Sequence, residues 1–191
     1  MKVLVACEFS GVVRDAFIRR GHDAWSCDFL PTERLGNHFQ ADVRTVLQTN
    51  QFDLIVAHPP CTYLANSGVQ YLHTRPGRWR LMEDARDFFL WLLSYPCEKV
   101  AVENPTPHGY ANLPKYSQAV QPYEYGHLQS KRTCLWLKRL PLLKATNNVY
   151  SEMMKLPLSQ RQSLWWGGKS NAKNRSRTFQ GIADAMAAQW G

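Results

Sequence analysis

The sequence lacks several features that would assign the chain to a class at once. Its 191 residues contain no apolar run of about 18 residues, so we expect no membrane-spanning segment. There is no internal repeat and no low-complexity tract. The apolar stretch that opens the chain ends at Glu8, too early for a signal peptide, so a first β-strand is the better interpretation.

Cysteine is present only in small number. The five cysteines stand at positions 7, 27, 61, 97 and 134, and none belongs to a Cys-x-x-Cys pair or to a Cys/His zinc spacing. We therefore expect reduced thiols, a cytoplasmic location and no metal site.

Acidic side chains are also scarce. Asp and Glu number 15 against 23 Lys and Arg, which gives a formal charge of +8. This excess favours a polyanionic partner such as nucleic acid, although a solvated basic surface would show the same balance. With 45% hydrophobic and 20% charged residues the composition is that of a globular protein, and the length suits a single domain over residues 1–191.

Short apolar runs alternate with amphipathic stretches along most of the chain. Strands are expected over residues 2–6, 22–27, 52–57, 99–102 and 133–137, and helices over residues 12–20, 78–93 and 179–190. Strands separated by helices predict an α/β fold with a doubly wound sheet. In such sheets ligands bind beyond the carboxyl ends of the strands.

Two reactive side chains follow neighbouring expected strands. Cys61 ends a Pro59-Pro60-Cys61 loop, and a thiol held there is well placed as a nucleophile, although cysteine more often serves as an apolar filler. Glu103 follows the next buried strand. A carboxylate across the same cleft can hold or donate a proton while a thiolate adds to an electron-poor ring; the alternative is a capping or loop carboxylate.

The first two strand ends carry features of a nucleotide-like ligand site. Phe9, Ser10 and Gly11 lie in the first strand-to-helix turn, and Asp28 follows the second strand, where an acid grips ribose hydroxyls. Asp42 could bond an adenine amine. A Gly-x-Gly-x-x-Gly pattern is absent, which favours a cofactor without phosphates over a dinucleotide.

The order of these motifs resembles the C5-cytosine DNA methyltransferases, which transfer methyl from S-adenosylmethionine (SAM). The matching segments are Phe9-Ser10-Gly11, Pro59-Pro60-Cys61, Glu103-Asn104-Pro105, the Tyr-Gly-His-Leu-Gln-Ser-Lys-Arg-Thr block at 125–133, and Gly181-Ile182-Ala183. The resemblance covers most of the chain, and its specificity lies in the ordered set rather than in any one motif.

The resemblance implies a Rossmann-like SAM-dependent methyltransferase sheet with helices on both faces. It implies that Cys61 adds to C6 of a flipped cytosine, that Glu103 engages N3 and the amino group, and that Lys131 replaces a family arginine beside the base. The residues it implies for SAM are Phe9, Ser10, Gly11, Asp28, Asp42 and Pro59.

The chain departs from the family pattern in three places. Val13 and Arg14 stand where the family has glycines after Phe-x-Gly, and Pro105 replaces a valine. Lys131 and Thr133 replace two arginines. Residues 144–177 form only a short basic and aromatic insert in place of a target-recognition domain, so we expect short or relaxed sequence preference.

Two basic stretches with interleaved aromatic residues could contact nucleic acid, or could be solvated loops. The first spans residues 73–80, and the second joins Trp165 and Trp166 to a basic run. The candidate contacts are Arg75, Arg78, Arg80, Lys169, Lys173, Arg175 and Arg177.

Three functions stay open at this point. The first is methylation of cytosine in DNA by a compact, phage-like enzyme, alone or with a partner that supplies recognition, as a monomer or small homo-oligomer. The second is modification of a free cytosine nucleotide, or a different C5 modification. The third is a DNA- or SAM-binding relic without catalysis. The Val13-Arg14 departure favours this hypothesis, whereas the retained Cys61 and Glu103 argue against it.

Overall fold

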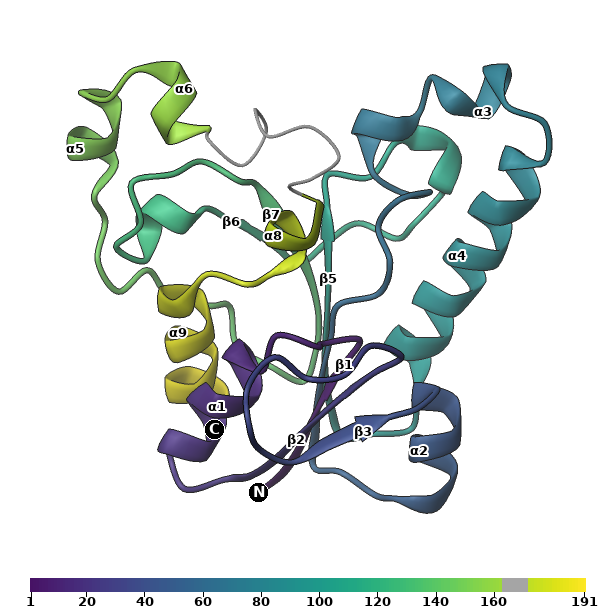
Figure 1. Ribbon diagram of the computed structural model, residues 1–191, viewed down its shortest axis with the longest axis vertical. Coiled ribbons are helices and arrows are strands. Elements are labelled where there is room, and N and C mark those ends of the chain that lie inside the picture. Colours follow the sequence, from purple (N-terminus) through teal and green to yellow (C-terminus); the bar gives the residue numbers. More distant parts are fainter. Residues whose placement is uncertain (163–171) are drawn as a thin grey trace.

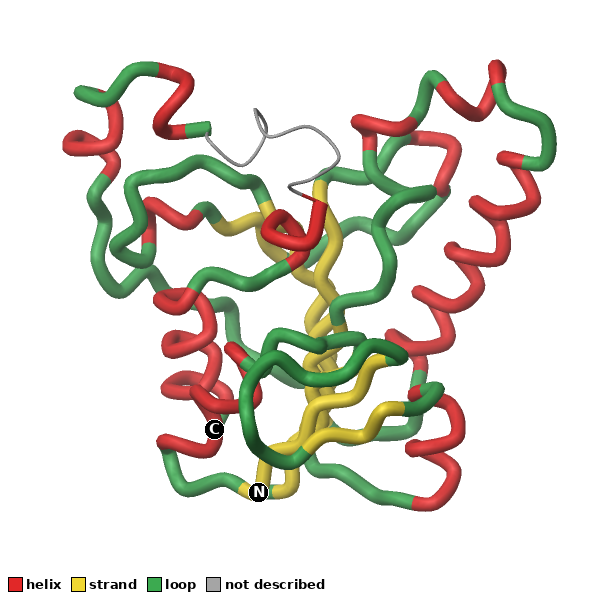
Figure 2. Tube along the Cα trace, viewed as in Figure 1, coloured by secondary structure: helices red, strands yellow, loops and turns green. Residues whose placement is uncertain are grey.

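Seven strands form one mixed sheet in the computed structural model, which describes residues 1–162 and 172–191 (Figures 1 and 2). The strands are β1 (Lys2–Ala6), β2 (Asp23–Asp28), β3 (His38–Gln40), β4 (Leu54–Ala57), β5 (Lys99–Pro105), β6 (Gln118–Val120) and β7 (Thr133–Lys138). Their order across the sheet is β3-β2-β1-β4-β5-β7-β6. The first five run parallel, and β7 is antiparallel to both β5 and β6.

Helices cover both faces of this sheet, as expected for an α/β fold (Figure 1). They are α1 (Val12–Arg19), α2 (Val43–Thr49), α3 (Tyr71–Thr74), α4 (Arg78–Ser94), α5 (Tyr150–Met154), α6 (Leu158–Arg161), α8 (Ala172–Ser176) and α9 (Gln180–Trp190). α1 and α9 pack on one face, and α2 and α4 on the other. Of the described helices, none combines the length and apolar character needed to cross a membrane.

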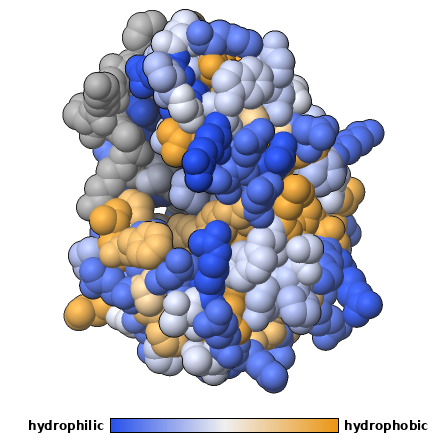
Figure 3. All heavy atoms as spheres, turned by 90° about the vertical axis from the view of Figure 1, so that its right-hand side faces the viewer, coloured by the Kyte–Doolittle hydropathy of each residue, from blue (hydrophilic) through white to orange (hydrophobic). Residues whose placement is uncertain are grey.

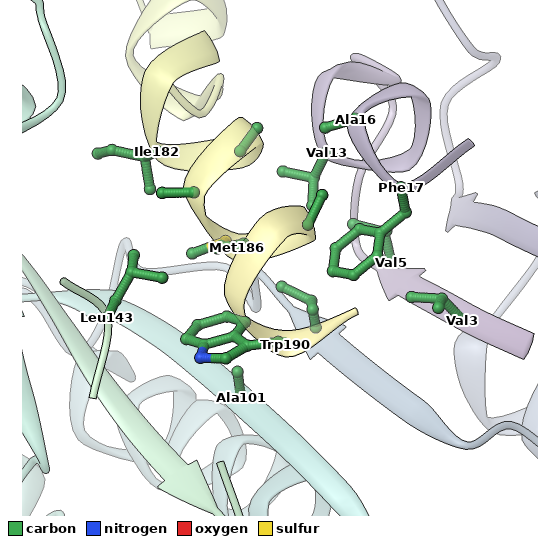
Figure 4. Packing of buried hydrophobic residues seen from close by; sticks show 14 of the residues in the cluster. Val3, Val5, Val13, Ala16, Phe17, Ala101, Leu143, Ile182, Met186 and Trp190 are labelled. Atoms are coloured by element: carbon green, nitrogen blue, oxygen red, sulfur yellow. The ribbon is translucent and has the colours of Figure 1, made fainter. Parts of the chain in front are cut away.

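Side-chain alternation along the strands builds two apolar cores. In β1, Val3 and Val5 enter the core beneath α1 and α9, whereas Leu4 and Ala6 enter the core beneath α2 and α4. Figure 4 shows Phe17 of α1 directed toward α9, and Trp190 of α9 lying beside Ala101. Burial on both faces explains why the central strands read as continuous apolar runs.

All five expected strands and all three expected helices are present, with shifted ends. β5 continues through Pro105 because the antiparallel β7 extends its ladder, so Glu103 lies within the strand, opposite Leu135, rather than after it. The sequence analysis missed the three-residue strands β3 and β6 and the short helices, since so few residues show no period.

A buried arginine organises the first strand-to-helix turn. The guanidinium of Arg14 is fully buried and donates hydrogen bonds to Asp15 (2.8 Å), Ser26 (3.1 Å) and Thr32 (3.1 Å) and to backbone carbonyls of the loop before β3. A Cβ on Gly11, whose φ is 71°, would lie 2.6 Å from this guanidinium. Arg14, one of the two residues that depart here from the pattern of the C5-cytosine methyltransferases, therefore holds the loop between β2 and β3 in place.

We expect Arg14→Ala to lower the free energy of unfolding by at least about 3 kcal/mol, because it leaves several buried acceptors without a donor. The control is Arg19→Ala on the same helix, whose ion pair with Asp184 has both side chains 52% exposed. That change should cost less than about 1 kcal/mol. Urea denaturation of both variants measures the difference, and equal midpoints would contradict this account of Arg14.

Candidate active site

The parallel pairing of β4 with β5 brings the expected nucleophile and carboxylate to one place. Ala57 pairs with Val102, so the chain beyond β4 passes beside Glu103. Cys61 lies in the loop that follows, half-buried, and Glu103 is close enough to influence its ionisation. The adjacency expected from the sequence is therefore present in the structure.

The loop that carries Cys61 is tied down from two sides. His108, which is buried, donates from Nε2 to the Tyr63 carbonyl at 2.9 Å, and its backbone N donates to the Leu64 carbonyl at 3.0 Å. Arg78 donates to the Thr62 carbonyl at 2.7 Å and lies 4.3 Å from the Tyr63 ring centroid. Arg78 is buried, so the structure places this proposed nucleic-acid contact beneath the loop as its support.

Charge around Cys61 and Glu103 shifts their ionisation in opposite directions. Burial and the neighbouring Glu103 carboxylate raise the pKa of the Cys61 thiol, against the opposing charges of Lys131 and Arg175. Burial alone would raise the pKa of Glu103, but His58 and Lys131 outweigh it and lower that pKa below its usual value. Near neutral pH the pair therefore holds a protonated thiol beside an ionised carboxylate.

Lys131 joins the site to the segment that precedes α9. Its ammonium donates to the backbone carbonyls of Arg175 and Arg177, and it acts electrostatically on both Cys61 and Glu103. Lys131 thus places a cation beside Cys61 and Glu103, and part of its hydrogen-bonding capacity is used to hold the backbone of residues 175–177.

A cavity of about 380 Å³ opens at the carboxyl ends of β1 and β2. Asp28 and Asp42 line it, together with the guanidinium-bearing Arg44. The rest of its wall is mostly apolar and consists of Cys7, Cys27, Phe29, Ala41, Val43, Pro60, Tyr63, Leu81, Asp84, Ala85 and Phe88. Because Pro60 lines the cavity and Cys61 follows it, the cavity adjoins the loop that carries Cys61.

Two of the three carboxylates that line this cavity, Asp28 and Asp42, are held in fixed positions. Asp28 accepts a hydrogen bond from the backbone N of Leu30 at 2.9 Å, and Asp42 caps α2 by accepting one from the backbone N of Arg44 at 2.8 Å. A ligand with hydroxyl and amine donors on a flat apolar body would match such a wall. Phe9, Ser10, Gly11 and Pro59 are buried and do not line the cavity.

Two thiols contribute neutral surface to the same cavity. Burial, with the negative charge of Asp28, raises the pKa of Cys27 to about 11 and raises that of Cys7 further. Cys7 has a left-handed backbone, with φ of 59°, which is costly for a residue with a Cβ and is found at functional sites. Sequence reasoning missed Cys7, Phe29 and Phe88, because apolar residues at strand ends and on helices read as ordinary core.

An exposed cluster of three rings lies at the N-terminal end of α4. His73, Trp79 (41% exposed) and Tyr110 (52% exposed) contact one another edge to face, with ring centroids 5.3–5.5 Å apart. The exposed Arg75 and Arg80 flank it. On this side of the molecule, hydrophilic residues dominate above an apolar band that crosses the middle (Figure 3). The sequence analysis did not find Tyr110, because folding alone brings it beside residues 73–80.

The remaining residues that were expected to contact nucleic acid lie in different surroundings. Arg177 forms a bidentate ion pair with Glu33, at 2.8 and 2.7 Å. Arg175 is half-buried near Cys61, and its carbonyl holds Lys131. Trp165, Trp166 and Lys169 lie outside the described residues, as does the side chain of Lys173.

The raised pKa of Cys61 predicts how fast its thiol reacts. Alkylation of Cys61 by iodoacetamide should accelerate with pH up to and beyond pH ~9, because only the thiolate reacts. Glu103→Gln should increase the rate at a fixed pH, since it removes the negative charge that disfavours the thiolate. Peptide mass spectrometry follows the modification, and a rate that levels off below pH ~7 would contradict this electrostatic account.

No protein-family model and no curated protein matches the chain. Similar solved structures include a putative DNA modification methyltransferase encoded within an Escherichia coli prophage, at 14% identity and a TM-score of 0.46, covering 72% of this chain and 46% of that one. The Entamoeba histolytica methyltransferase EhMeth is similar at 14% identity and a TM-score of 0.46, covering 78% and 57%. An rRNA methylase from Escherichia coli gives 16% identity and a TM-score of 0.37, covering 71% and 55%.

The chain thus spans about half the length of the solved structures that it matches. Likeness at these TM-scores and identities carries no conclusion about activity. We therefore infer function from the side chains of this chain.

Proposed function

We propose that the protein transfers a methyl group from SAM to C5 of cytosine in DNA through a covalent adduct on Cys61. The observation that supports this most directly is the meeting of a thiol and a carboxylate: Cys61 lies in the loop that follows β4, and Glu103 lies within β5, the adjacent parallel strand. A cavity lined by Asp28, Asp42 and Asp84 adjoins the same loop through Pro60. The motif order that resembles C5-cytosine methyltransferases supplies the identity of the base.

The residues of the site account for the chemistry in order. Cys61 loses its proton to water, and its thiolate attacks C6 of the base while the displaced ring electrons reach N3, which takes a proton by way of Glu103. The positive charge of Lys131 opposes the accumulation of negative charge as the thiolate forms. After C5 has been methylated, water takes the C5 proton as the thiolate leaves C6, which restores the ring double bond.

The cavity fits the cofactor that this reaction needs. The Asp28 carboxylate suits ribose hydroxyls, Asp42 suits an adenine amine, and the apolar wall with Phe29 and Phe88 suits a purine ring. No glycine is among the described residues that line the cavity, in keeping with a cofactor that has no phosphates. SAM, when bound, supplies an electrophilic methyl group on a sulfonium.

The ring cluster and its flanking arginines are the proposed contact with DNA. A target base must leave the duplex before Cys61 can reach it, and exposed rings stack on bases that have lost their partners. Arg75 and Arg80 have no ion-pair partner among residues 1–162 and 172–191 and can therefore bind phosphates. Residues 144–177 are too few for a full target-recognition domain, which supports short or relaxed sequence preference.

Nucleoside mass spectrometry tests the reaction and the nucleophile together. DNA from methylation-deficient cells should contain 5-methylcytosine when the wild type is expressed and none with Cys61→Ala, because the adduct cannot form. The control is Cys97→Ala, a buried thiol that donates to the Phe52 carbonyl away from the cavity. A Cys61→Ala protein that still methylates would contradict the covalent mechanism.

Binding of SAM to the same proteins separates the cofactor site from the nucleophile. Cys61→Ala should bind SAM as the wild type does, whereas Asp28→Ala should bind about 10- to 100-fold more weakly, through loss of charge-assisted hydrogen bonds. Asp23→Ala, at the other end of β2, is the matched control. Methylation of free dCMP instead of DNA would favour the nucleotide substrate, and a wild type that binds no SAM would favour a relic.

Trp79→Ala should weaken binding of a labelled oligonucleotide about tenfold, because a stacking surface is lost. Trp79→Phe, which keeps a ring, should retain most of the affinity. Arg80→Ala should weaken binding of all sequences alike and reduce the salt dependence by about one unit of slope. Fluorescence anisotropy at several salt concentrations measures these effects, and full affinity in Trp79→Ala would remove the cluster from the DNA surface.

A further inference from the structure

His58 is a buried imidazole without a hydrogen-bond partner. Its side chain is 8% exposed, and both ring nitrogens are buried and unpartnered among the described residues. Polar groups in protein interiors are nearly always hydrogen-bonded, so an unsatisfied one needs an explanation. An imidazole that served only for packing would cost free energy of desolvation, which an apolar side chain of similar size would avoid.

The backbone around His58 fixes the direction in which the ring can act. Its backbone N donates to the Ala6 carbonyl at 2.9 Å, which continues the parallel ladder of β4 and β1 by one residue. Since Ala57 pairs with Val102, His58 lies beside Glu103 in register. The ring Nδ1 is 3.8 Å from Glu103 Oε2, longer than a hydrogen bond but within the reach of a shift of about 1 Å.

We propose that His58 is the positioning residue of Glu103 and the source of the proton that Glu103 passes to the base. This inference rests on the proposed function. An ionised carboxylate only accepts hydrogen bonds, so Glu103 cannot protonate a ring nitrogen until it receives a proton itself. His58 is the buried neighbour able to carry one, and the unpartnered nitrogens leave room for it.

The proton transfers balance over one turnover. As the Cys61 thiolate forms its bond to C6, the displaced ring electrons reach N3; N3 takes the proton of Glu103, and Glu103 Oε2 takes the proton of His58 Nδ1. His58 is then neutral, and N3 carries the proton. When the adduct breaks down, the proton returns from N3 through Glu103 to His58, so no external acid is consumed.

Other ionisable groups around the pair act on the same proton. Lys131, from the segment before β7, also lowers the pKa of Glu103. The pKa of Cys61 is raised by Glu103 and lowered by Lys131 and Arg175. The charge of Glu103 also raises the pKa of Cys134 in β7. Lys131 already donates hydrogen bonds to two backbone carbonyls, and Arg175 lies on α8. We therefore assign the supply of the proton to His58, the imidazole next to the Glu103 carboxylate, and not to either of these cations.

The test compares His58→Asn with the wild type and with His22→Asn as the matched control. His22 precedes β2 at the opposite end of the sheet. Adduct formation with an oligonucleotide containing 5-fluorocytosine, followed across pH 5–10, should be about 100-fold slower in His58→Asn at neutral pH. The alkaline decline of the rate of adduct formation should occur at lower pH in His58→Asn than in the wild type, since only the proton of Glu103 itself remains. His22→Asn should match the wild type.

A rate in His58→Asn equal to that of the wild type, or reduced by the same factor at every pH, would overturn the role in proton transfer. A second measurement does not depend on that variant folding or on turnover. In histidine-selective ¹⁵N NMR spectra, the ring signals of His58 should move in Glu103→Gln, and unchanged signals would overturn the pairing. A wild type that forms neither adduct nor 5-methylcytosine would refute the proposed function itself, while the NMR result would still report on the pair.

Discussion

The parallel pairing of β4 with β5 is the constraint on which the rest of the site depends. It aligns Ala57 with Val102, and the loop beyond β4 then has to pass Glu103. A slip of one residue would turn Glu103 to the opposite face of the sheet and separate it from Cys61. Burial on both faces of the central strands makes such a slip costly, so the hydrophobic core also secures the geometry of the chemistry.

The antiparallel strand β7 completes this arrangement from the other side. It extends β5 through Pro105 and thereby holds Glu103 within a ladder instead of on a loop. A carboxylate held in this way keeps one position, whereas the thiol opposite stands on a loop braced by Arg78 and His108. Rigid support of the acid and a braced loop for the nucleophile suit a reaction that needs both groups within reach of one ring.

Electrostatics then distinguishes the two sides of the site. His58 and Lys131 lower the pKa of Glu103, whereas Glu103 raises and Lys131 lowers the pKa of Cys61. The adjoining cavity is different, because its thiols are neutral and the carboxylates of Asp28 and Asp42 are already engaged by backbone N–H groups. In the proposed reaction, proton transfer thus involves Cys61, Glu103 and His58, and the adjoining cavity is suited to holding a ligand.

The sequence by itself determined the α/β class, the main strands and helices, and the types of the reactive residues. It could do so because apolar periodicity depends on local spacing, and because Cys61 and Glu103 stand at the ends of strong runs. It also indicated Asp28 and Asp42, which do line the cavity.

Only the tertiary structure decided which of the other candidates face that cavity and which support it. Arg78 and Arg14 are basic residues in the sequence but buried braces in the fold, and Tyr110 joins Trp79 from a distant segment. The partnership of His58 with Glu103 was equally invisible, because it depends on the register between two strands that the chain connects through a long crossover. Such register is set by the packing of the whole core, and no local pattern encodes it.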